Sequence, residues 1–226
     1  MKIGVIFSGS GVYDGTEIHE GVFTLLSIKK AGGESVCFAP DVDQHHVVNH
    51  ITGKEMGETR NVLVESARIA RGAIHSLDKF NADELDALVL PGGFGAAKNL
   101  TKWAFSGPDG EINAQVKAAI VAMVKAGKPV AGLCMGPTVI AKALEGSGVS
   151  ATLTVGTTEK PSPYEIDAIN QGMEKAGATA VMKTIEEIAV DEQNKIVTAP
   201  CYMMEADILQ IRNNVQKAVD ALVKLV

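Results

Sequence analysis

The segment Val130-Ala131-Gly132-Leu133-Cys134-Met135-Gly136 places a cysteine at the end of a short apolar run, with a glycine two residues before it and another two residues after it. Residues 130–133 are predicted to form a buried strand, and residues 136–144 are predicted to form a helix. A nucleophile between two such glycines, at a strand-to-helix junction, is the pattern of a nucleophile elbow, because the turn is too tight for a Cβ at either glycine. The segment therefore predicts an α/β fold with Cys134 on an exposed turn.

The thiol of Cys134 is predicted to lie at the N-terminus of that helix. Unpaired amides and the helix dipole favour the thiolate at such a position, and a thiolate is the reactive form of cysteine. The alternative is that Cys134 is a small apolar residue packed between strand and helix, because buried free cysteines are common.

Short β-branched runs alternate with longer segments of helical period on both sides of the elbow, which is typical of parallel βαβ units. The predicted strands are residues 3–7, 35–39, 86–90, 130–133 and 152–155, with a hairpin over residues 185–199. The predicted helices are residues 17–31, 61–70, a segment carrying Ile112 to Met123, 136–144, 166–176 and 208–225. No internal repeat or linker interrupts the chain, so a single domain over residues 1–226 is predicted.

Composition limits the class of protein and of partner. The chain has 226 residues, 46% of them hydrophobic, and a net charge of −6, so it is predicted to be globular and not to bind nucleic acid. The three cysteines are an odd number and widely spaced, which argues against disulfides and predicts a cytoplasmic protein. The few apolar residues at the start are too short for a signal peptide or membrane span, so neither export nor a membrane location is expected.

A glycine-rich loop, Pro91-Gly92-Gly93-Phe94-Gly95, follows the predicted strand 86–90. Consecutive glycines can turn several backbone N–H groups toward one point, and this is the geometry of an oxyanion hole. Alone the motif is weak, since such loops are more often only turns. It lies one βα unit before the elbow, however, and loops of this kind gather at the carboxyl ends of parallel strands.

Two acidic residues, Glu17 and Glu20, lie three apart at the start of the first predicted helix and therefore on one face of it. Crowding two carboxylates raises the proton affinity of one of them. The alternative is the ordinary acidic bias of a first helical turn. The nearby Ser8-Gly9-Ser10-Gly11 segment resembles a dinucleotide-binding loop, but Asp14 stands where the third glycine is required, so no cofactor is predicted.

A polar insertion covers residues 40–60 and carries His45, His46 and His50. His46 and His50 have the spacing of a helical metal-ligand pair. No cysteine or glutamate cluster completes a ligand set, so no metal is predicted and the segment is interpreted as a polar pocket wall.

The chain resembles the ElbB family, a member of the DJ-1/PfpI branch of the class I glutamine amidotransferase-like proteins. The resemblance covers essentially the whole chain and is carried by the elbow at residues 132–136, the loop PGGFGAAKN at 91–99, the opening segment FSGSGVYDG at 7–15, and the motifs NHITG at 49–53 and ETRN at 58–61. It implies a flavodoxin-like, doubly wound sandwich with a mostly parallel sheet, a homodimer, and a link to isoprenoid biosynthesis.

The resemblance also implies a cofactor-free glyoxalase acting on small dicarbonyls such as glyoxal and methylglyoxal. In the superfamily a glutamate at a helix start hydrogen-bonds the elbow thiolate, and its match here is Glu20, with Glu17 the weaker match. The chain has no histidine after His75, so the triad of a glutaminase is not expected. Met135 replaces the histidine that follows the nucleophile in peptidase-like members, which argues against proteolysis.

These observations lead to one expected mechanism. Cys134 adds to the aldehyde carbon, the amides of Gly93 and Met135 hold the resulting oxygen, and Glu20 moves protons, with His50 as the second choice of base. Gly92, Glu17 and His50 are expected around the pocket. The rival interpretation is a protein without catalytic activity that uses the same thiol as an oxidation switch or for binding.

Overall fold

The computed structural model describes residues 1–226 and contains a central seven-stranded sheet. Its strands are β1 (Lys2–Ile6), β2 (Glu34–Ala39), β5 (Ile74–Ser76), β6 (Ala87–Leu90), β7 (Val130–Leu133), β10 (Ala189–Asp191) and β11 (Ile196–Ala199). They are ordered β10-β11-β7-β6-β1-β2-β5, and all pairs are parallel except β10 with β11. The predicted α/β fold with a mostly parallel sheet is confirmed, and β7, the strand before the elbow, lies inside the sheet.

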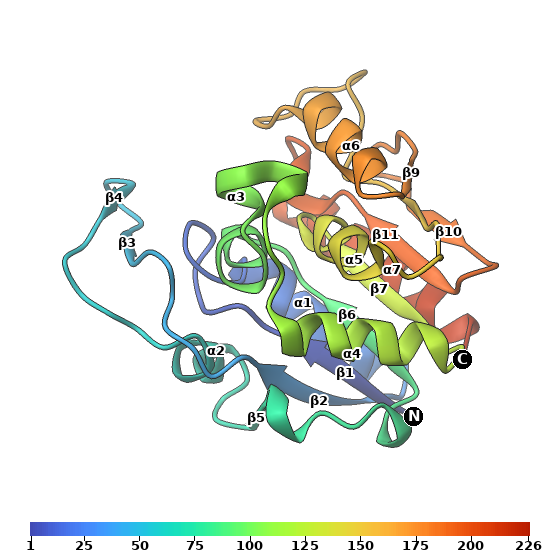
Figure 1. Ribbon diagram of the computed structural model, residues 1–226, viewed down its shortest axis with the longest axis horizontal. Coiled ribbons are helices and arrows are strands. Elements are labelled where there is room, and N and C mark those ends of the chain that lie inside the picture. Colours follow the sequence, from blue (N-terminus) through green and yellow to red (C-terminus); the bar gives the residue numbers. More distant parts are fainter.

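Helices cover both faces of this sheet. They are α1 (Ile18–Lys30), α2 (Val62–Ile69), α3 (Trp103–Ser106), α4 (Ala114–Lys125), α5 (Gly136–Leu144), α6 (Ile166–Lys175) and α7 (Ile208–Lys224). Figure 1 shows α4 and α5 in front of the sheet and α1 and α7 behind it, and the members of each pair contact one another. The sheet is therefore buried on both faces, which is why its strands read as continuous apolar runs.

Side chains at the predicted helix starts cap the helices that follow. Glu17, Asn61 and Asn113 accept hydrogen bonds from first-turn amides of α1, α2 and α4. Asp207 forms a capping box with Gln210 at the start of α7. Such caps satisfy amides that have no partner inside the helix, and they fix the direction in which the first turn of α1 faces the sheet edge.

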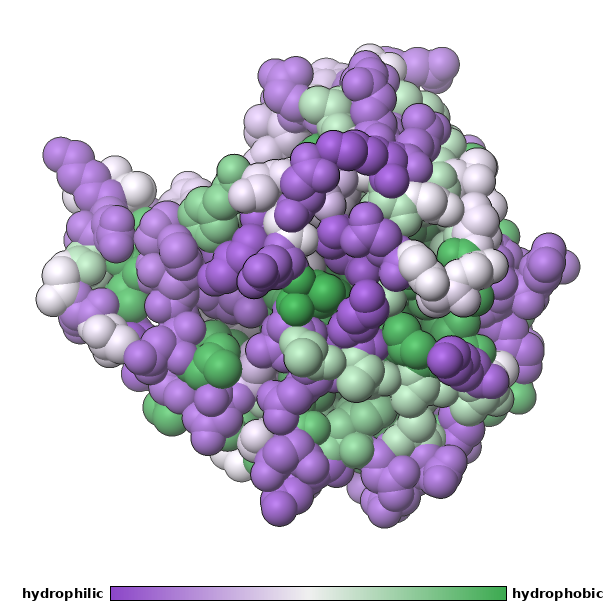
Figure 2. Space-filling view, in the orientation of Figure 1, coloured by the Kyte–Doolittle hydropathy of each residue, from purple (hydrophilic) through white to green (hydrophobic).

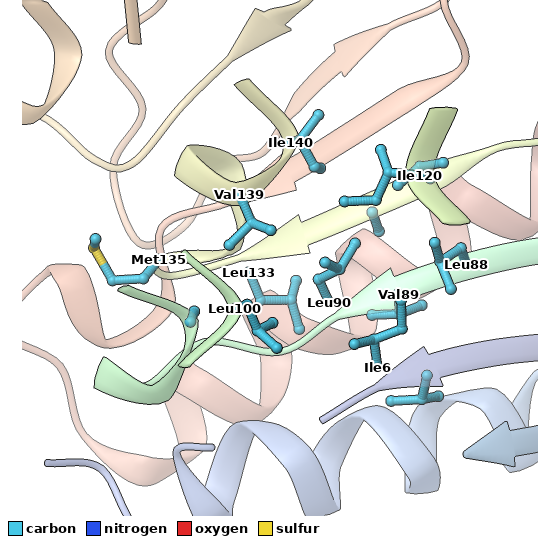
Figure 3. Close-up of a cluster of buried hydrophobic side chains, with 14 of the residues drawn as sticks. Ile6, Leu88, Val89, Leu90, Leu100, Ile120, Leu133, Met135, Val139 and Ile140 are labelled. Carbon is cyan, nitrogen blue, oxygen red and sulfur yellow. The ribbon is translucent and has the colours of Figure 1, made fainter. Parts of the chain in front are cut away.

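The core beneath the site is formed where α4 and α5 pack on the sheet. Figure 3 shows Ile120, Val139 and Ile140 meeting the leucines of β6 and β7, with Met135 at the edge of the cluster. Ile140 and Leu133 are fully buried. This packing holds the end of β7 and the start of α5 in one rigid block.

Three local predictions differ from the structure. The strand predicted at residues 152–155 is β8 (Thr152–Leu153), which pairs with β9 (Thr179–Ala180) in a separate two-stranded sheet and not in the main one. Ile112 precedes α4 and forms a bridge with Thr101. The polar insertion contains a hairpin of β3 (Val48–Asn49) and β4 (Lys54–Glu55). Periodicity alone does not assign a two-residue strand to a sheet.

The front face of the molecule is chemically mixed. Figure 2 shows pale green surface over α4, whose outward residues include Ala114, Ala118 and Ala122, with hydrophilic side chains around it. None of the helices combines the length and the apolar composition needed to cross a bilayer.

Candidate active site

Cys134 lies on the turn between β7 and α5, with a φ of 56°. This left-handed conformation is rare for a residue with a side chain and stores strain. A Cβ on Gly132 would lie 2.8 Å from Ile140 Cδ1, and a Cβ on Gly136 would lie 2.6 Å from the Leu90 carbonyl oxygen. Both glycines are therefore required for the close approach of strand and helix, as the elbow pattern predicts.

The glycine-rich loop after β6 contacts the elbow directly, because β6 and β7 are neighbours in the sheet. The backbone amides of Gly93 and Met135 face the sulfur of Cys134 and act to lower its pKa. A Cβ on Gly92 would collide with the side chain of Cys134, so the loop approaches the thiol as closely as a backbone can. Two N–H groups from separate loops thus converge beside the sulfur, which is the arrangement that stabilises a developing negative charge.

Glu20 lies beneath the thiol and is fully buried. Its Oε2 accepts a hydrogen bond from the Gly92 amide at 3.0 Å, and its Oε1 accepts one from the Tyr202 amide at 3.2 Å. The side chain of Cys134 is its neighbour and acts to lower its pKa. Burial, and then the charge of Glu17, raise the pKa of Glu20 from its ordinary value of 4.5 to about 8. A carboxyl group with a pKa near neutrality is suited to both accept and donate protons.

Glu17 is the N-cap of α1 and also lines the cavity in front of Cys134. Its Oε2 accepts a hydrogen bond from the Glu20 amide at 2.8 Å, and burial raises its pKa. His19 Nδ1 lies 4.0 Å from Glu17 Oε1 and 2.8 Å from the Tyr202 hydroxyl oxygen. The two glutamates that the sequence places on one helix face are therefore close together, with Glu20 inside and Glu17 at the cavity wall.

The expected lowering of the Cys134 pKa by the helix N-terminus is wrong. Burial and the carboxylate of Glu20 raise the pKa of the thiol well above its ordinary value, although the amides of Gly93 and Met135 act in the opposite direction. The side chain is 5% exposed, so the loss of hydration outweighs the helix dipole. Cys134 is therefore a thiol at rest, paired with an acid of raised pKa, and it needs a base to become a nucleophile.

The raised pKa of Glu20 should make the free energy of unfolding depend on pH. Between pH 4.5 and about 8 the folded chain holds a proton on this carboxyl that the unfolded chain has lost, so this group makes stability fall as pH rises. Glu20→Gln removes that dependence. The free energy of unfolding of Glu20→Gln relative to the unmutated chain should therefore rise by on the order of a few kcal/mol between about pH 5 and pH 8.

Urea unfolding at both pH values measures this difference. Glu174→Gln, at an exposed position on α6, is the matched control, and it should follow the unmutated chain at both pH values. A constant difference between Glu20→Gln and the unmutated chain would show that Glu20 titrates alike in the folded and unfolded states.

A cavity of about 170 Å³ opens in front of Cys134. Its walls come from the loops at the carboxyl ends of β1, β6, β7 and β11, together with α3, α6 and the segment before α6. The lining residues are Val12, Glu17, Gly93, Phe94, Ala97, Trp103, Ala104, Cys134, Met135, Tyr164, Ile169, Tyr202 and Met203. Of the residues expected around the pocket, Glu17 lines it, while Gly92 lies behind the thiol.

His50 does not line this cavity. Its Nε2 accepts from the Tyr13 amide at 3.2 Å, its Nδ1 lies 3.0 Å from the Val48 carbonyl oxygen, and its ring stacks on Tyr13. Both ring nitrogens are thus engaged by backbone, one by Val48 in β3 and the other by Tyr13 in the segment between β1 and α1. His45 and His46 pack on Phe105. The interpretation of these histidines as a pocket wall is therefore wrong, because residues 40–60 fold beside the β1 loop and not over the elbow.

Tyr164, Tyr202 and Trp103 also line the cavity, and the sequence did not indicate them as site residues. Tyr202 follows β11, the neighbour of β7, and its amide holds Glu20 across 182 residues of sequence. The signal available was the position of Cys201 and Tyr202 directly after a buried strand, because parallel strands deliver such residues to one edge. Tyr164 precedes α6 and carries no local signal. The structure contains no group of three or more His, Cys, Asp or Glu side chains able to hold a metal ion.

Comparison with known proteins gives consistent relatives. The family model described as DJ-1/PfpI family matches residues 13–206. A solved structure from Ehrlichia chaffeensis, an isoprenoid biosynthesis protein with amidotransferase-like domain, has a TM-score of 0.90 and 30% identity, covering 100% of this chain and 99% of that one. The human glutamine amidotransferase-like class 1 domain-containing protein 3, mitochondrial, is 40% identical over 99% of this chain and 83% of its own. A deglycase from Thermococcus kodakarensis is 32% identical over 69% of this chain and 78% of its own.

These relatives contradict the predicted cytoplasmic location. The human relative is a mitochondrial protein, as are the ES1 proteins of Rattus norvegicus and Danio rerio. All three cysteines of the present chain are free and buried. An odd number of unpaired cysteines argues only against disulfides and does not separate one reducing compartment from another. The family model spans most of the sheet and every element that builds the elbow, and the chain belongs to the DJ-1/PfpI family.

Proposed function

We propose that this chain is an ElbB-type member of its family and a cofactor-independent glyoxalase, which converts small 2-oxoaldehydes such as glyoxal and methylglyoxal to hydroxy acids. One observation carries the proposal. Cys134 faces a cavity, and its sulfur lies beside the buried carboxyl of Glu20 and the amides of Gly93 and Met135. A nucleophile, a proton carrier and an anion site are thus assembled around one point.

The first step is addition of sulfur to the aldehyde carbon. The Glu20 carboxylate takes the thiol proton as the C–S bond forms, which meets the need for a base that the raised pKa of Cys134 creates. The aldehyde oxygen becomes the oxygen of a hemithioacetal. It develops negative charge beside the amides of Gly93 and Met135, and it then takes up the proton that Glu20 received from the thiol, which restores the Glu20 carboxylate.

The second step moves a proton between neighbouring carbons. Glu20 removes the proton from the former aldehyde carbon while the ketone oxygen takes a proton from solvent, giving an enediol. Glu20 then returns its proton to the adjacent carbon while the hydroxyl on the former aldehyde carbon loses its proton to solvent, so that the ketone becomes an alcohol and the sulfur carries a thioester. Water then cleaves the thioester, releasing the hydroxy acid and the thiol. The sum is one oxoaldehyde plus one water to one hydroxy acid, and no oxidant or reductant is consumed.

Three further observations support this reaction over its rivals. One relative is named as a deglycase, which is an enzyme, and this favours catalysis over binding in this family. No histidine lines the cavity, so the base of a glutaminase triad has no counterpart beside Cys134. An oxidation switch requires an exposed thiol of lowered pKa, whereas Cys134 is buried and its pKa is raised.

The test is conversion of methylglyoxal by the purified chain in D2O, without glutathione or added metal. We expect lactate, and we expect deuterium at its C2, because the proton of the enediol passes through a carboxyl that exchanges with solvent. Proton NMR reads both results from the lactate methyl signal, with 2-mercaptoethanol alone as the control. Absence of lactate would overturn the proposal. Lactate with only protium at C2 would show that the transferred hydrogen does not exchange with solvent, which is the result for a hydride shift and for return of the same proton by the buried Glu20.

A further inference from the structure

The walls of the cavity are almost entirely apolar. Of the residues that line it, only Glu17 and Gly93 are not hydrophobic. Four aromatic side chains contribute, Phe94, Trp103, Tyr164 and Tyr202. The rings of Phe94 and Tyr164 meet edge to face, with centroids 5.9 Å apart at 67°. A surface of this kind gains free energy by excluding water from an apolar group.

The size of the cavity exceeds what glyoxal or methylglyoxal fills. An engineered apolar cavity of about 150 Å³ in another protein binds benzene, and the cavity in front of Cys134 measures about 170 Å³. A molecule whose reactive carbon lies at the sulfur therefore has room for a six-membered ring against the aromatic wall. The substituent on the second carbonyl carbon is only a hydrogen atom in glyoxal and a methyl group in methylglyoxal. Neither is large enough to fill the space beside the aromatic side chains.

The charges around the cavity select against anions. No lysine, arginine or histidine lines it, while Glu17 is in its wall and Glu20 lies behind the thiol. The ammonium of Lys98 lies 5.3 Å from the centroid of the Phe94 ring, outside the cavity lining, and donates to the Tyr13 carbonyl oxygen at 2.8 Å. A carboxylate or phosphate on the substrate would therefore enter an apolar space without a cation to pair with, which is costly.

We propose that the natural substrates are 2-oxoaldehydes whose ketone carbon bears an uncharged apolar group of up to about phenyl size. The inference rests on the proposed glyoxalase function and narrows its substrate class. Cys134 and Glu20 act on the dicarbonyl carbons, and the aromatic wall holds the substituent. Glyoxal and methylglyoxal are then minimal substrates that react without using most of the binding surface.

The first experiment compares glyoxal, methylglyoxal, phenylglyoxal and 4-carboxyphenylglyoxal with the full chain. Each kcat/KM is divided by the rate at which the same aldehyde adds to 2-mercaptoethanol, which removes differences in intrinsic reactivity. One methylene group that fits an apolar pocket raises kcat/KM by about tenfold or more. The corrected kcat/KM of phenylglyoxal should therefore exceed that of glyoxal by roughly 100-fold. The carboxylated ring should fall at least about tenfold below phenylglyoxal, because its charge is unpaired.

The second experiment fills the cavity. Ala97 is buried at the wall, and Ala97→Leu takes up space that the ring requires. The ratio of phenylglyoxal to methylglyoxal kcat/KM should drop about tenfold or more. This ratio is measured within one preparation and does not depend on the fraction that folds. Ala122→Leu, on α4 and outside the cavity, is the matched control and should leave the ratio unchanged.

The outcomes separate the two proposals. Turnover of methylglyoxal with no advantage for phenylglyoxal, or an advantage that Ala97→Leu does not reduce, overturns the substrate class and leaves the glyoxalase function standing. Failure of all four aldehydes to react overturns both. Conversion of 4-carboxyphenylglyoxal as fast as phenylglyoxal would show that a cation reaches the cavity. Mandelate formation is followed directly, so that modification of arginine by phenylglyoxal is not counted as turnover.

Discussion

Cys134→Ser is expected to lower methylglyoxal turnover by at least about 1,000-fold. The serine hydroxyl occupies nearly the same space on the elbow, so the fold and the cavity are retained. Its proton is far harder to remove than that of a thiol, and the buried carboxyl of Glu20 is too weak a base to remove it. Neither the hemithioacetal nor the thioester can then form. Lactate production measures the loss, and thermal unfolding checks that the variant is folded.

The other two cysteines provide matched controls. Cys37 is buried in β2, where burial raises its pKa to about 11, and Cys201 is buried just after β11. Cys201 also has a positive φ, of 47°, at the start of a short 3-10 helix. Neither Cys37 nor Cys201 lines the cavity, however, so Cys37→Ser and Cys201→Ser should keep most of the turnover. Equal loss in Cys201→Ser and Cys134→Ser would contradict the assignment of Cys134 as the sole nucleophile.

The elbow and the helix starts are the parts of the site that the sequence predicts well. Strand, turn and helix are contiguous at residues 130–144, and the steric need for Gly132 and Gly136 arises within that segment or from the adjoining strand. Glu17 and Glu20 are likewise placed by the local geometry of one helix N-terminus. Such short-range constraints act through backbone geometry and do not depend on how distant elements pack.

The positions of the other site residues depend on tertiary packing and are not predicted by the local sequence. Tyr202 reaches Glu20 only because β11 lies beside β7, and Tyr164 reaches the cavity only because the segment before α6 crosses the sheet edge. The π-helical turn Ala96–Leu100 and α3 have no clear apolar period. Even so, Ala97 in the first and Trp103 in the second are buried and form part of the cavity wall. The direction of the Cys134 pKa was mispredicted for the same reason, since burial is set by elements far away in sequence.

Glu20→Gln is expected to lower methylglyoxal turnover by about 100-fold or more, the range that general acid–base catalysis contributes. Glutamine keeps the size of the side chain, and its one oxygen can accept from either the Gly92 amide or the Tyr202 amide, which donate to different oxygens of Glu20. It cannot take the thiol proton or carry a proton between the substrate carbons. Lactate production again measures the loss, and alkylation of Cys134 by iodoacetamide reports separately on the thiol.

The pH dependence distinguishes proton transfer from simple disturbance of the pocket. In the unmutated chain, turnover should rise as pH passes through about 8, because Glu20 becomes the carboxylate that accepts the thiol proton there. Glu20→Gln should lose this inflection in its residual turnover. Its alkylation should show one thiol titration, at a lower pKa than in the unmutated chain, because the carboxylate charge that raises the pKa of Cys134 is gone.

Glu17→Gln is the matched control for charge. Its side-chain oxygen still accepts from the Glu20 amide and caps α1, but the charge that raises the pKa of Glu20 is removed. The inflection near pH 8 should therefore persist and move to lower pH, whereas Glu20→Gln abolishes it. If Glu20→Gln instead kept both its turnover and its inflection, the proton carrier would be another group. His50 would be a poor replacement, because backbone contacts engage both of its ring nitrogens outside the cavity.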